Sequence, residues 1–142
     1  MFLLKVHENA CTETTPDIIG SPTASRGIID VYDVFGFMPQ TFQGADRLAE
    51  SLNAIILVPD FLKGKYAQGA WFAAPPTEGP EKAAYDEFRK NRAFENHVQP
   101  LLNVTHAAKE KFADFKAWGA FGLCWGGKVG CIGIRCWLFI AC

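Results

Sequence analysis

Cys124 is the residue of this chain best suited to chemistry, because glycines flank it at a characteristic spacing. Gly122 precedes it by two residues, and Gly126 and Gly127 follow it by two and three. This G-x-C-x-G-G pattern is typical of a nucleophile elbow, a sharp strand-to-helix turn in which larger side chains would clash. Such a turn presents the thiol together with backbone N–H groups that can bind an oxyanion and stabilise a thiolate. We therefore take Cys124 as the candidate nucleophile.

Other interpretations of the cysteines are weaker or remain open. The same spacing fits a tight connection in which the cysteine only packs. A redox sensor would need a resolving thiol near Cys124, and Cys131 is poorly placed for that. The five cysteines have no C-x-x-C pair and no histidine at ligand spacing, which argues against a disulfide framework or a zinc site. We expect free thiols and no metal or organic cofactor.

The elements around Cys124 predict an α/β fold. The apolar run 117–123 predicts a buried strand that leads into the turn, and runs 27–32 and 54–58 predict two more. Helical spacing over 39–52 joins the latter two strands, which implies a parallel, right-handed βαβ unit. Because loops after parallel strands line a common crevice, the turn at Asp33 is expected to share a cleft with Cys124.

The remaining segments predict supporting structure. Residues 1–25 lack periodicity and suggest an irregular arm or a degenerate edge strand. The loop 61–80 carries Trp71 and Phe72 between glycines and prolines, so we expect a lid or pocket wall rather than a merely packed loop.

Two helices are expected next, over 81–92 and 95–115. His97 and His106 lie on the second helix, which should pack behind the sheet. We therefore expect both histidines at the surface or its boundary, without a catalytic role.

Two motifs in order resemble the dienelactone hydrolases, α/β-hydrolase-fold enzymes with a cysteine nucleophile. The motifs are Tyr-Asp-Val-Phe-Gly-Phe at 32–37 and Gly-Leu-Cys-Trp-Gly-Gly-Lys at 122–128. Short stretches at 39–41, 44–46 and 59–61 are similar to the fungal branch of that family. The resemblance covers residues 26–130.

The resemblance implies a three-layer α/β-hydrolase-like parallel sheet and a small lactone or ester as substrate. It assigns Cys124 as the nucleophile, with an oxyanion hole from the backbone N–H groups of Val34 and Trp125. It also implies that Asp33 is a carboxylate that modulates activation of the thiol. The alternative for Asp33 is a loop aspartate that caps its own turn.

The resemblance stops after residue 130. Family members continue and supply a catalytic aspartate and histidine, neither of which this chain has. We therefore expect a sheet that is incomplete at the C-terminus, a partial domain at 26–130 and an aberrant apolar tail at 131–142. The predicted function is a cysteine hydrolase with an incomplete triad; the alternative is a non-catalytic truncated remnant or ligand-binding pseudo-hydrolase.

Composition limits the partners. With 14 basic and 15 acidic residues the net charge is −1, and no basic stripe is present to attract phosphates. Nucleic acid is therefore not an expected partner. No apolar run approaches the ~18 residues of a membrane span, so the expected location is the cytoplasm. The sequence leaves the oligomeric state open.

Overall fold

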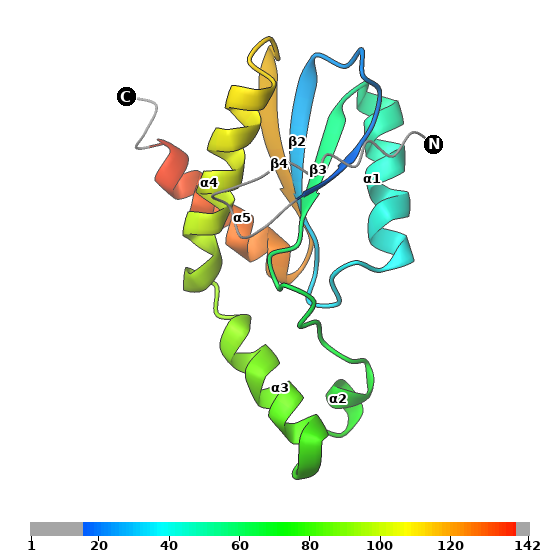
Figure 1. Ribbon diagram of the computed structural model, residues 1–142, viewed down its shortest axis with the longest axis vertical. Helices are drawn as coiled ribbons and strands as arrows, with labels where there is room; N and C mark the ends of the chain where they lie inside the picture. The colour runs from blue at the N-terminus through cyan, green and yellow to red at the C-terminus, as the bar shows by residue number, and fades with distance from the viewer. Residues whose placement is uncertain (1–15, 139–142) are drawn as a thin grey trace.

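The computed structural model describes residues 16–138, which form a four-stranded sheet with helices on both faces (Figure 1). In chain order the elements are β1 (Pro16–Ile19), β2 (Arg26–Val31), α1 (Pro39–Leu52), β3 (Ile55–Pro59), α2 (Ala70–Ala73), α3 (Gly79–Asn91), α4 (Glu95–Lys111), β4 (Ala117–Gly122) and α5 (Trp125–Leu138).

The sheet is mixed, with strand order β1-β3-β2-β4. Strand β2 is parallel to β3 and β4, as the βαβ pattern predicts, whereas β1 runs antiparallel to β3. The three strands predicted as parallel are therefore confirmed as parallel, but the sheet as a whole is mixed. Of the two alternatives for the segment before residue 26, an edge strand is present at 16–19, where Pro16 pairs with Pro59 and Ile19 with Ile56. Residues 1–15 lie outside the described part.

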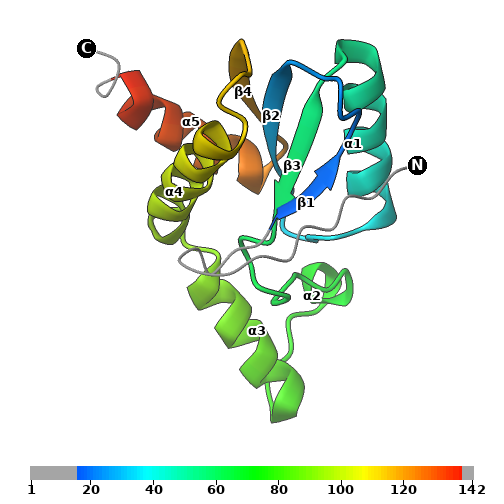
Figure 2. The same cartoon turned by 45° about the horizontal axis from the view of Figure 1, so that its top comes forward.

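Three layers are present. Helix α1 covers one face of the sheet, and α4 with α5 covers the other (Figures 1 and 2). Every residue of β3 is buried, because helices cover this strand on both faces of the sheet. Small residues on α1, Ala45 and Ala49, allow that helix to approach the sheet closely.

Strand β4 is the exposed edge of this sheet, contrary to the expectation of a buried strand. Phe121 is 40% exposed to solvent, and Leu123, just beyond the strand, is 60% exposed. Trp118 and Gly122 are the half-buried residues of the strand, and Trp118 stacks on Phe115. The apolar run predicted a strand correctly, but burial also depends on neighbours, and no described strand pairs with the outer side of β4.

Helix boundaries also differ from expectation. Helix α4 ends at Lys111 rather than 115, and Phe112 and Phe115 instead pack against each other beside Trp118. Helix α5 continues to Leu138, so the expected boundary between 130 and 131 falls inside it, and residues 139–142 lie outside the described part. Among the described helices, none combines the length and apolarity that crossing a membrane requires.

Candidate active site

Cys124 lies in the turn between β4 and α5, in a left-handed conformation with a φ of 54°. Its carbonyl accepts a hydrogen bond from the Lys128 N–H at 3.3 Å, which closes the first turn of α5. Non-glycine residues rarely adopt positive φ, and such strain is retained where the surroundings enforce it. The side chain of Cys124 is exposed.

The flanking glycines enforce this conformation by close backbone packing. A Cβ at Gly126 would lie 1.8 Å from the carbonyl oxygen of Val31, and one at Gly122 would lie 2.6 Å from the carbonyl carbon of Gly126. A Cβ at Gly127 would lie 3.0 Å from the Gly122 carbonyl oxygen. The start of α5 therefore rests directly on the ends of β2 and β4, and the spacing of the glycines is a steric requirement.

The turn after β2 lies beside the cysteine turn. In the parallel pairing of β2 with β4, Val31 is the partner of Gly122, so Asp33 and Cys124 each follow two residues beyond a paired position. The Asp33 Oδ1 atom accepts a hydrogen bond from the Phe35 N–H at 2.8 Å. This contact corresponds to the turn-capping alternative, and Asp33 is not among the residues that line the pocket next to Cys124.

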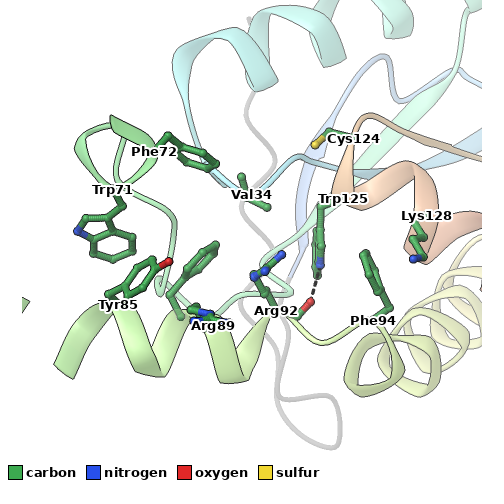
Figure 3. A pocket seen from close by; sticks show the side chains of 11 residues that line it. Val34, Trp71, Phe72, Tyr85, Arg89, Arg92, Phe94, Cys124, Trp125 and Lys128 are labelled. Atoms are coloured by element: carbon green, nitrogen blue, oxygen red, sulfur yellow. Dashed lines mark hydrogen bonds between the residues drawn. The ribbon is translucent and has the colours of Figure 1, made fainter. Parts of the chain in front are cut away.

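A pocket of about 320 Å³ opens beside Cys124 (Figure 3). One wall comes from the cap segment, which we define as residues 63–94. The other comes from the body, by which we mean the rest of the described residues. The body contributes Val34, Cys124, Trp125 and Lys128, and the cap segment contributes Trp71, Phe72, Tyr85, Phe88, Arg89, Arg92 and Phe94. Trp71 and Phe72 belong to the loop that was expected to form a lid or pocket wall, and they line this pocket.

Three cations surround the pocket. The guanidinium carbons of Arg89 and Arg92 lie 5.8 and 5.9 Å from the ring centroids of Tyr85 and Phe88, and the Lys128 Nζ lies 4.2 Å from that of Phe94. None of the three takes part in an ion pair within the described residues. Aromatic faces contact these cations without neutralising their charge, so the lining that the structure describes carries positive charge.

The two predicted oxyanion donors lie at this pocket. Val34 and Trp125 both line it with Cys124. Within the described residues, the backbone N–H groups of Val34 and Trp125 donate to no other backbone group. Trp125 is at the start of α5 and Val34 is in the turn after β2, and unpaired N–H donors of this kind are suited to binding a developing negative charge.

His97 is buried, so the expectation of a surface histidine was wrong. Only 3% of its surface is exposed, and its ring packs edge-on against Trp125 with centroids 4.8 Å apart. Its Nε2 lies 2.6 Å from the Asn91 carbonyl oxygen, which can only accept, so Nε2 carries the proton. Burial lowers the pKa of His97 below 6.5. His106 is largely exposed, as expected.

Sequence reasoning missed Arg89, Arg92 and Lys128 as members of the site. The three-residue spacing of Arg89 and Arg92 does place them on one helix face, which is the only signal the sequence offered. Which face points to the pocket depends on the path of the cap segment.

The fold and this site together define a mixed α/β protein that presents a cysteine at a strand-to-helix turn. The sequence is 31% identical to an AIM2 family protein of Schizosaccharomyces pombe over 121 residues, 81% of this chain and 45% of that protein. It is 34% identical to a second S. pombe AIM2 family protein over 124 residues, 82% of the chain and 49% of that protein. Both relatives are described as uncharacterized.

A third relative is an endo-1,3;1,4-beta-D-glucanase of Zea mays, 33% identical over 118 residues, 79% of the chain and 32% of that protein. The chain therefore spans less than half the length of these relatives. No protein-family model matches the sequence. No solved structure matches it either.

Proposed function

We propose that this chain carries the nucleophile portion of a dienelactone hydrolase-type site on an α/β-hydrolase-like scaffold. Its substrate class is a small ester or lactone that bears a negative charge. The observation that carries this proposal is Cys124, held at positive φ by the glycine contacts and exposed beside a pocket lined by three cations that form no ion pair within the described residues. The maize relative is a hydrolase by its name, which supports the general class alone.

In the proposed reaction the Cys124 thiolate attacks the carbonyl carbon, and the carbonyl π electrons move onto oxygen. The N–H groups of Val34 and Trp125 stabilise this oxyanion. When the intermediate collapses, the C–O bond to the leaving group breaks and the leaving oxygen takes a proton from water. A thioester remains on Cys124, and attack by water releases the acid and the thiol.

A general base for this chemistry does not come from the histidines of the described part. His97 is committed to the Asn91 carbonyl, and neither it nor His106 lines the pocket. General acid–base assistance contributes about 10² to 10⁴-fold, whereas a cysteine retains some reactivity because part of it is thiolate at neutral pH. We therefore expect the chain as given to acylate and then to turn over slowly.

The test is a rapid-mixing assay of the full chain with p-nitrophenyl acetate. The expected result is a burst of p-nitrophenolate of at most one equivalent, followed by a slow steady phase. The burst should disappear in Cys124→Ala and persist in Cys131→Ala, since Cys131 is an exposed thiol that does not line the pocket. A burst of equal size in Cys124→Ala would contradict the assignment, and the absence of a burst in the wild-type chain would favour a non-catalytic, ligand-binding role.

A further inference from the structure

The cap segment is joined to the body of the protein at its C-terminal end by three side-chain hydrogen bonds. The Trp125 Nε1–H donates to the Arg92 carbonyl at 2.8 Å, as Figure 3 shows. The His97 Nε2–H donates to the Asn91 carbonyl at 2.6 Å, and the Asn91 Nδ2–H donates to the Leu62 carbonyl at 3.0 Å. Two of these bonds satisfy carbonyls at the end of α3, which its own helix leaves without partners.

One of the donors is the residue that directly follows the candidate nucleophile. The Trp125 indole packs between two rings, with Tyr32 stacked at 6.4 Å and His97 edge-on at 4.8 Å. Tyr32 is itself fixed, since its hydroxyl donates to Asp60 and accepts from the Leu62 N–H. The position of Trp125 is therefore set by the core rather than by the cap segment.

The cations that belong to the cap segment lie within one helical turn of these bonds. Arg89 precedes Asn91 by two residues, and Arg92 supplies the carbonyl that Trp125 holds. Figures 1 and 2 show α2 and α3 beyond the end of the sheet, away from α1. Phe88 of α3 packs into the main core cluster, and the hydrogen bonds at the C-terminal end of the helix fix the turn that carries both arginines.

We propose that Trp125, His97 and Asn91 form a latch that positions Arg89 and Arg92 at the mouth of the Cys124 pocket. Through the two arginines, the latch sets the preference of the site for anionic over neutral reactants. The relevance to substrate choice rests on the proposed function. The positioning itself does not, and it can be measured without any ester.

The probe is a pair of alkylating reagents of nearly equal size. In both iodoacetate and iodoacetamide, a thiolate forms a bond to carbon and expels iodide, but only iodoacetate is anionic. The ratio of their rates at one cysteine therefore reports local cationic potential, because the thiolate fraction cancels. Peptide mass spectrometry on the full chain would measure this ratio at Cys124, with exposed Cys131 as an internal reference.

We expect the iodoacetate-to-iodoacetamide ratio at Cys124 to exceed that at Cys131 by about three- to tenfold. Trp125→Phe keeps an aromatic ring but removes the donor, and Asn91→Leu removes the bond to Leu62. The variant Arg89→Gln removes one of the two cap-segment cations directly. Both latch variants should lower the iodoacetate-to-iodoacetamide ratio at Cys124 toward the ratio measured for Arg89→Gln. Asn91 is only half-buried, so its variant remains informative if Trp125→Phe fails to fold.

The matched control is Thr105→Val. It removes a buried 2.7 Å hydrogen bond from Thr105 Oγ1 to the Leu101 carbonyl, within α4 and away from the cap segment. Its ratio should equal that of the wild-type chain; an equal fall in this control would assign the effect to general loosening and overturn the latch.

Two further results would also overturn the proposal. One is an unchanged ratio in both latch variants while Arg89→Gln lowers it, because the arginine would then hold its place unaided. The other is equal ratios at Cys124 and Cys131 in the wild-type chain. If p-nitrophenyl acetate gives no burst, the hydrolase function fails but these ratios still decide the latch.

Discussion

Strands β2 and β4 lie side by side in parallel, yet they differ in burial and in how the turns after them are held. Strand β2 is in the interior of the sheet and ends in a turn that the Asp33 side chain caps. Strand β4 is an exposed edge, and its turn is fixed by the absence of side chains at three glycines. The strained cysteine therefore depends on backbone contacts with the end of β2 and not on burial of its own strand.

The largest expected effect comes from placing a side chain in the backbone contact between the start of α5 and the end of β2. Gly126→Ala would place a Cβ 1.8 Å from the Val31 carbonyl oxygen, which neither backbone can relieve without moving α5. We expect destabilisation of more than about 4 kcal/mol and loss of a cooperative thermal transition.

Gly130→Ala is the control for this substitution. It lies in the same helix with nothing within 4 Å of its Cβ, so alanine should be neutral or stabilising by up to about 1 kcal/mol. Similar melting curves for the two variants would show that the Gly126 contact does not determine the turn.

The second effect concerns a buried carboxyl group in β2, the interior strand. Asp30 in β2 is 5% exposed, and burial raises its pKa from 3.8 to about 6. Between pH 3.8 and about 6 the folded state binds a proton that the unfolded state has lost. The contribution of Asp30 to the free energy of unfolding therefore falls as the pH rises through this range. The difference corresponds to about 3 kcal/mol of destabilisation at neutral pH.

Asp30→Asn should therefore raise stability by up to about 3 kcal/mol at pH 8 and by little near pH 4. Urea titrations of both chains at the two pH values would measure this. A stability difference independent of pH would show that the carboxyl group is solvated rather than desolvated.

A smaller effect is expected at the turn after β2. Asp33→Ala removes the acceptor of the Phe35 N–H and should cost about 1 kcal/mol, whereas Asp33→Asn retains an oxygen there and should cost less than about 0.5 kcal/mol. The Asn variant therefore separates the turn from the charge. If it also leaves the iodoacetamide rate at Cys124 unchanged, the turn is the sole role of Asp33 and the proposed effect on the thiol is wrong.

The same contrast explains what the sequence could and could not predict. The glycine turn was predictable because the spacing of the glycines around Cys124 itself indicates a strand-to-helix turn, although the contact that forbids a Cβ at Gly126 is with Val31, which is distant in sequence. Strands β2 and β3 and helix α1 were predictable from apolar spacing. Burial of β4 was not, since it depends on which elements lie beside the strand.

The rest of the site could not be predicted from the sequence, because it depends on packing between residues that are distant in the chain. Strand β1 has only four residues, too few for periodicity to indicate a strand. The burial of His97 follows from contact with Trp125, which is distant in sequence, and the arginines reach the pocket only through the path of the cap segment.

The central claim, that Cys124 is the reactive nucleophile, is tested most directly by locating the acyl group itself. The full chain would be quenched with acid during the p-nitrophenyl acetate burst and its cysteine peptides analysed by mass spectrometry. The account predicts acetylation on the peptide that contains Cys124, in proportion to the burst, with little on exposed Cys131. Equal acetylation of the two thiols, or acetylation of other side chains in proportion to the burst, would contradict it.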